Sequence, residues 1–197
     1  KVPGGYIYYD AATGTITDAD INITSAVIPS TINGTTITSI DSMAFDTCWD
    51  VLSIEIPETV TYIGDYAFQH CSCITEITLP QGIKSIEKGT FSNCSSLEKI
   101  NMPAELESIA DNAFYNCTSL QSITIPSSVK AMGINTLRSC SALKSVSLPP
   151  LTKIPSGTFA DCTGLENVTL SQGLVTIGDN AFYGCTSLKS INLTEGI

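Results

Sequence analysis

Positively charged residues are scarce in this sequence. Its 197 residues include nine Lys and Arg against nineteen Asp and Glu, and the net charge is −10. A chain with this balance repels phosphate backbones, so a nucleic-acid partner is not expected. The sequence also lacks any apolar run of about 18 residues, the length that a membrane-spanning helix needs. We therefore expect no membrane span in this chain.

Histidine is rarer still, since His70 is the only one. Catalysis by a Ser-His-Asp or Cys-His group needs a histidine within hydrogen-bond reach of its nucleophile. His70 directly precedes Cys71, whose side chain is expected to point into the core. The acidic residues are scattered, and no Gly-rich phosphate-binding loop is present. We therefore expect no catalytic residues, no cofactor and no enzymatic activity.

A metal site is the other use that histidine and cysteine suggest. His70, Cys71 and Cys73 lie together in the sequence, with Cys48 and Cys94 one repeat away on either side. Structural zinc sites usually carry two paired sets of ligands such as Cys-x-x-Cys. Here the cysteines come one to a repeat, and His70 takes a position that other repeats fill with Asn or Asp. We expect no metal ligands among them.

An internal repeat of 23 residues dominates the sequence. Its cysteines recur in steps of 23, 23, 23, 23, 22 and 23 residues at Cys48, Cys71, Cys94, Cys117, Cys140, Cys162 and Cys185. An aromatic residue or leucine precedes each cysteine by three positions: Phe45, Phe68, Phe91, Phe114, Leu137, Phe159 and Phe182. One unit reads Cys-x-x-Leu-x-x-Ile-x-Leu-Pro-x-x-Val-x-x-Ile-x-x-x-Ala-Phe-x-x. Copies in register over the whole chain indicate a repeat protein.

The pattern inside one unit predicts a single short strand. The Ile-x-Leu step has period two, so both side chains point to one face of an extended segment. The proline that follows cannot donate to a ladder, which ends the strand. The Ala-Phe-x-x-Cys stretch is too short for a helix and predicts a helical turn or an irregular arc. One unit cannot bury this much apolar surface alone, so the units are expected to stack into about seven turns with parallel strands.

The pattern resembles that of the BspA-like (Treponema-type) leucine-rich repeat family. The resemblance rests on residues 65–68 (Asp-Tyr-Ala-Phe) before Cys71, on residues 77–80 (Ile-Thr-Leu-Pro), and on their counterparts in the other turns. It covers residues 23–197 and implies a right-handed leucine-rich-repeat solenoid. It also implies a cell-surface or secreted location, because many members are surface proteins of mouth and gut bacteria and some are adhesins.

The two ends of the chain differ from the repeats. Residues 6–17 contain two β-prone runs around a glycine, which predicts a hairpin. We expect residues 1–22 to cap the first turn and residues 23–197 to form the repeats. The first step, between Ile28 and Ile56, is five residues longer than a turn, and we place the insertion at residues 32–36. Residues 193–197 break off inside a repeat, so we expect the array to continue in a longer protein.

The cysteine column is predicted to hold free thiols. Seven cysteines at one apolar repeat position are typical of a buried stack of small hydrophobic side chains. Neighbouring turns lie close enough for a disulfide, but the Cβ vectors should run parallel rather than converge. Free thiols are therefore favoured over bridges, and a thiol titration of the denatured protein separates the two.

The outward positions of the predicted strand are the candidate partner-binding residues. They form two short, polar columns on one face of the sheet. The first column is Ser53, Glu76, Lys99, Ser122, Ser145 and Asn167, and the second is Glu55, Thr78, Asn101, Thr124, Ser147 and Thr169. Such columns suit either a solvated sheet surface or an extended platform for a partner.

Aromatic residues outside the core columns are the other candidates for a binding surface. They are Trp49, Tyr62, Tyr66, Tyr115 and Tyr183. We expect Trp49, the only tryptophan, to pack against the N-terminal hairpin. The favoured function is a non-catalytic adhesion or binding domain for a surface protein or glycan of the host or of bacteria. The alternative is a passive spacer that holds other domains away from the cell.

Overall fold

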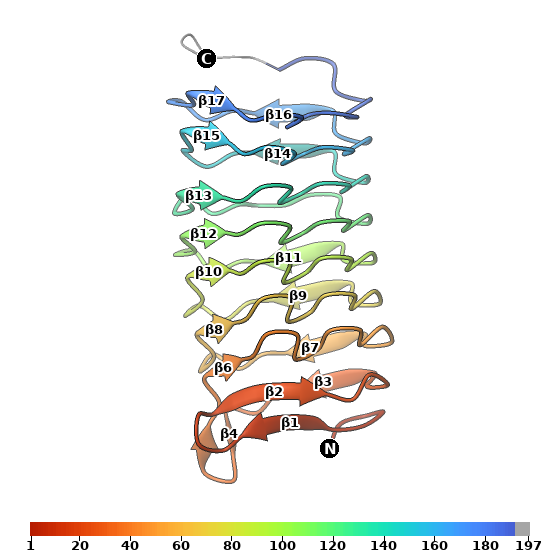
Figure 1. The fold of residues 1–197 in the computed structure, drawn as a ribbon, viewed down its shortest axis with the longest axis vertical. Helices are drawn as coiled ribbons and strands as arrows, with labels where there is room; N and C mark the ends of the chain where they lie inside the picture. Colours follow the sequence, from red (N-terminus) through yellow and green to blue (C-terminus); the bar gives the residue numbers. More distant parts are fainter. Residues whose placement is uncertain (192–197) are drawn as a thin grey trace.

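The computed structural model describes residues 1–191 as a stack of turns that runs from the N-terminus at one end to residue 191 at the other (Figure 1). This part of the chain contains seventeen short strands and no helix. The predicted solenoid of about seven turns is confirmed. The predicted break inside a repeat at residues 193–197 lies outside the described residues.

One series of parallel strands corresponds to the predicted Ile-x-Leu segments. They are β3 (Ser25–Val27), β7 (Ser53–Glu55), β9 (Glu76–Thr78), β11 (Lys99–Asn101), β14 (Ser145–Ser147) and β16 (Asn167–Thr169). They pair at like repeat positions, as Ile77 with Ile100 and Val146 with Val168. The turn around Ile123 departs from the prediction of a strand in every repeat, because only Ser122 forms a bridge there, to Ser145.

A second series of strands lies on another side of the stack, and the sequence did not predict it. They are β2 (Thr15–Ala19), β6 (Ser39–Ile40), β8 (Tyr62–Ile63), β10 (Ser85–Ile86), β12 (Ser108–Ile109), β13 (Ala131–Met132), β15 (Lys153–Ile154) and β17 (Thr176–Ile177). All but β2 have two residues, too short for an alternating pattern to appear. Each exists because the turn beside it supplies a partner in register, as Ile86 does for Ile109.

Two hairpins interrupt the regular stack near its start. Strand β1 (Ile7–Asp10) pairs antiparallel with β2, which confirms the predicted N-terminal hairpin. Strand β2 also pairs in parallel with β6, so the hairpin continues directly into the stack. Strands β4 (Thr31–Ile32) and β5 (Thr35–Thr36) form a small hairpin around an Asn-Gly turn, at the predicted insertion. The division into residues 1–22 and 23–197 stays a prediction.

Left-handed backbone conformations recur at two positions of every regular turn. One lies five residues before the cysteine and the other directly before it, as at Asn112 (φ 56) and Asn116 (φ 60). Asn, Asp and His adopt this region more readily than other residues, and Gly adopts it freely. This requirement explains why the position before the cysteine carries His70, Asn93, Asn116, Asp161 and Gly184.

Asn116 allows this backbone requirement to be measured. Asn116→Val is expected to lower the free energy of unfolding by about 1–2 kcal/mol more than Asn116→Gly does. Both variants lose the amide bond to Asn93, so their difference isolates the strain of a β-branched residue at φ 60. Urea unfolding of the two proteins side by side gives the value. Equal stabilities would show that the turn relaxes out of the left-handed region.

The core consists of side chains stacked column upon column. Phe45, Phe68, Phe91 and Phe114 are fully buried, and consecutive rings stack with centroids 5.3–5.6 Å apart. All eight cysteines are free thiols, as predicted. Each column thiol from the second turn on lies 3.0–3.3 Å from the carbonyl of the core residue of the preceding turn, to which it donates. The column therefore links neighbouring turns by weak hydrogen bonds rather than by disulfides.

Candidate interaction surface

The two predicted polar columns lie together on the face formed by the first series of strands. Every member is exposed except Asn101, which is half-buried. Between the members lie the buried Ile54, Ile77, Ile100 and Val146, so the alternation of strand side chains separates core from surface. The structure thus brings the twelve candidate residues onto one continuous face of five strands and the Ser122–Thr124 segment.

The middle of this face holds an ordered network of polar contacts. The Lys99 Nζ lies 2.7 Å from Glu76 Oε1, and the Asn101 amide donates to the same oxygen at 2.9 Å. Asn101 also donates to Thr78 Oγ1 at 2.9 Å. The hydrogen bond from Lys99, with that from Asn101, lowers the pKa of Glu76 below its usual value. These contacts fix the side chains of β9 and β11 before any partner arrives.

The face is shallowly hollowed rather than flat. The largest hollow holds about 600 Å³ and is lined by Lys99, Asn101, Ser122 and Thr124, together with residues of the following turn. Two smaller hollows lie along the same face, one at Glu55 and the other beside Ser147. The hollows follow the predicted columns, and the side chains that line them are mostly short.

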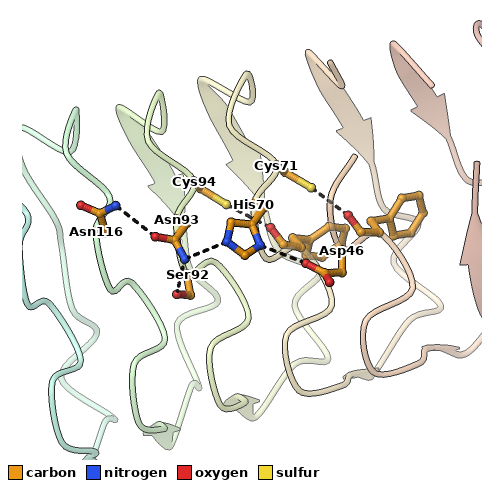
Figure 2. Close-up of polar contacts among 9 residues, drawn as sticks. Asp46, His70, Cys71, Ser92, Asn93, Cys94 and Asn116 are labelled. Atoms are coloured by element: carbon orange, nitrogen blue, oxygen red, sulfur yellow. Dashed lines mark hydrogen bonds and ion pairs between the residues drawn. The ribbon is translucent and has the colours of Figure 1, made fainter. Parts of the chain in front are cut away.

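His70 takes part in a chain of side-chain contacts that crosses four turns (Figure 2). The Asn93 amide donates to His70 Nε2 at 3.2 Å, so the other ring nitrogen, Nδ1, carries the proton and contacts Asp46 Oδ1 at 3.3 Å. Asn116 donates to Asn93 Oδ1 at 3.0 Å. The Cys71 thiol points instead into the core, toward the Phe45 carbonyl. His70 and Cys71 thus serve separate structural contacts and form no catalytic pair.

The cysteines, histidine and acids do not gather into a metal site. Within residues 1–191, no three His, Cys, Asp or Glu side chains lie close enough to hold a metal ion together. The stacked geometry explains this, because one cysteine per turn spreads the thiols along the whole core. In the same part of the chain, nothing helical is long and apolar enough to span a membrane.

The aromatic residues outside the core fall into two groups. Tyr66 and Tyr115 are half-buried, whereas Trp49, Tyr62 and Tyr183 are exposed. Trp49 keeps 59% of its surface exposed, so the expectation that it packs against the N-terminal hairpin is wrong. The polar columns, by contrast, contain no aromatic residue.

The geometry defines the chain as a leucine-rich-repeat solenoid that exposes one long polar sheet face. The family model described as the BspA type leucine rich repeat region matches residues 19–144 and 132–197. The chain therefore belongs to the BspA-type leucine-rich repeat family. No curated protein matches the sequence.

Two solved structures illustrate the likeness. The chain is similar to the leucine-rich repeat protein TpLRR of T. pallidum, with 29% identity over 94% of this chain and 88% of that one, and a TM-score of 0.85. It also has the fold of the pneumococcal vaccine antigen PcpA, with 19% identity over 98% of this chain and 71% of that one, and a TM-score of 0.61.

Proposed function

We propose that this chain is a non-catalytic binding domain, at the cell surface or secreted, that presents its sheet face to a protein or glycan. The observation that carries the proposal is the exposure of both polar columns along the whole series of strands. A regular, uncovered sheet of short side chains offers an extended contact area, and short side chains lose little entropy when a partner orders them. The network around Glu76 adds preorganisation to the centre of that area.

Family membership supports the extracellular part of the proposal. BspA-type repeats are typical of surface and secreted proteins, and one solved relative of the same fold is a vaccine antigen of pneumococcus. The acidic composition agrees with a protein or glycan partner rather than a nucleic acid.

A passive spacer is the second candidate. The observation that favours it is the regular stack in Figure 1, whose turns each add about 4.8 Å to its length. A spacer needs no ligand of its own. It predicts that another rod of equal length can replace this chain without loss of a neighbouring domain's activity.

A binding screen with paired variants tests the proposal. The protein is screened against immobilised matrix proteins and glycans, and Ser122→Arg with Thr124→Arg then blocks the centre of the face. Binding to any partner found is expected to weaken by about tenfold or more, because two bulky charges enter the contact area.

The matched control places the same two charges elsewhere. Thr152 and Thr176 are exposed beside and within the second series of strands, and Thr152→Arg with Thr176→Arg should leave binding unchanged. Equal losses in both double variants would show that the sheet face is not the contact surface. A screen without any partner would favour the spacer.

A further inference from the structure

The corner between the cysteine column and the sheet face follows a strict pattern in most turns. The residue after the cysteine is Ser or Thr: Ser72, Ser95, Thr118, Ser141, Thr163 and Thr186. Four of these hydroxyls, as at Thr118, donate to the carbonyl of the equivalent residue one turn earlier at 3.1–3.4 Å. The residue four places after the cysteine is also polar, as at Thr75, Glu98 and Gln121.

The first two turns break this pattern with large apolar side chains. Trp49 replaces the Ser or Thr, and Leu52 replaces the polar residue four places after the cysteine; they are 59% and 62% exposed. Ile21 is the counterpart of Trp49 in the turn before, since the Cys48 thiol contacts the Asp20 carbonyl and the Leu52 amide donates to Thr24. Ile21 is 61% exposed, and Val27, on the adjoining strand, is 63% exposed.

These four residues, which we call the N-terminal corner, have no structural task that the repeat requires. Other turns fold with small polar residues at the positions of Trp49 and Leu52, and Thr78 stands where Val27 stands two turns earlier. A cluster of exposed apolar residues confined to one end of a regular surface is typical of an interaction site. Tryptophan in particular dominates the binding energy of protein interfaces.

The charge around the N-terminal corner is of one sign. No Lys or Arg occurs between Lys1 and Lys84, whereas this stretch holds ten of the nineteen acidic residues. Asp46 and Asp50 flank Trp49 in the sequence. The pKa of the neighbouring Cys48 is raised to about 11, by burial first and then by the charges of Asp18, Asp46 and Asp20. These carboxylates therefore lie close to the corner.

The rest of the chain contrasts with this stretch. Within residues 1–191, every ion pair that involves Lys or Arg joins residues from position 76 onward. The acids of the first turns thus have no Lys or Arg of this chain as a partner. They leave a negative potential around an apolar centre.

We propose that the N-terminal corner binds a Lys- or Arg-rich protein segment that carries an apolar side chain between its basic residues. The apolar side chain packs against Leu52 and Ile21, and a cation lies over the exposed face of Trp49. The surrounding carboxylates attract the segment and give it orientation. This inference rests on the proposed binding function and names the partner's chemistry.

A second copy of the chain does not fit the same surface. Two N-terminal corners brought together would place like charges against each other, which costs several kcal/mol in an interface. Charge complementarity therefore favours a basic partner over self-association.

Trp49 itself reports on the test, because it is the only tryptophan. The intact chain is titrated with synthetic peptides in which one Leu or Phe is flanked on both sides by two Lys or Arg. Expected is a blue shift of the emission, because the ring leaves water, and an affinity that falls as NaCl rises. Matched peptides with Glu in place of the basic residues should give no shift.

Variants that restore the repeat pattern locate the binding. Asp50→Ser with Leu52→Thr introduces the residues found at Ser96 and Thr75, so the turn should still fold. Peptide affinity is expected to fall about tenfold. The control is Ile134→Ser, which removes an exposed apolar residue in a distant turn where Ser156 is the counterpart. It should leave affinity unchanged.

Several outcomes would overturn the inference. They are no shift with any basic peptide, equal shifts with acidic peptides, or equal losses in the corner and control variants. A shift with phosphatidylcholine vesicles but not with peptides would replace the protein segment with a lipid surface. Ser122→Arg with Thr124→Arg should leave peptide binding intact, so failure here is distinguishable from failure of the sheet-face proposal.

Discussion

Phe91→Ala is expected to lower the free energy of unfolding by about 4 kcal/mol. The Phe91 ring is 1% exposed and stacks between Phe68 and Phe114, with both centroid distances 5.6 Å. Its removal leaves a cavity in the middle of a continuous column, where turns on both sides hold the walls apart. Because domains are typically stable by only about 5–15 kcal/mol, the loss is a large part of the total. Chemical denaturation gives the difference.

Two further variants separate the cavity from the aromatic stacking. Phe91→Leu mimics Leu137, which occupies the same column with full burial, and should cost only about 1–1.5 kcal/mol. Phe182→Ala, at a half-buried position stacked on Phe159, should cost less than Phe91→Ala. If Phe91→Leu costs as much as Phe91→Ala, ring stacking rather than cavity volume dominates this core.

Alkaline pH is expected to unfold the protein more effectively than acid does. Burial raises the pKa of Cys94 and Cys162 from the ordinary value of 9.0 to about 12. It also raises the pKa of Cys71, Cys117 and Cys140 well above that value. The physical cause is that a thiolate in the apolar core would lose its hydration. The folded state therefore keeps these protons at a pH where the unfolded chain has released them.

The sign of the effect follows from this difference. Below pH 9 the thiols are protonated in both states, so the stability is fully present. Between pH 9 and the raised pKa values, only the unfolded chain ionises, and stability falls by about 1.4 kcal/mol per pH unit for each buried thiol. Five such thiols in one cooperative stack can offset the typical stability of a domain within about two pH units.

Unfolding free energies measured from pH 7 to pH 11 test this expectation. Cys117→Ala should make the decline less steep by the share of one thiol. The control is Val129→Ala, a buried residue without a titrating group, which should lower stability equally at every pH. A stability that stays flat to pH 11, or a slope that Cys117→Ala leaves unchanged, would contradict the account.

The candidate sheet face was largely predictable, and the candidate corner was not. Ser122 and Thr124 could be placed on the surface because they alternate with Ile123 and Ile125, which every turn keeps apolar. The exposure of Trp49 could not be read in this way. Its position is a surface position in the repeat, but whether the N-terminal hairpin covered it depended on the path of β1 and β2.

Amino-acid order alone determines the period, the core columns and the outward columns of this protein. It can do so because one side chain repeated every 23 residues must occupy the same place in every turn of a stack. The two-residue strands such as Ser85–Ile86, the thiol–carbonyl contacts and the His70 chain arise only in the tertiary structure. Their partners lie a full turn away, so no local pattern reveals them until the neighbouring turn is in place.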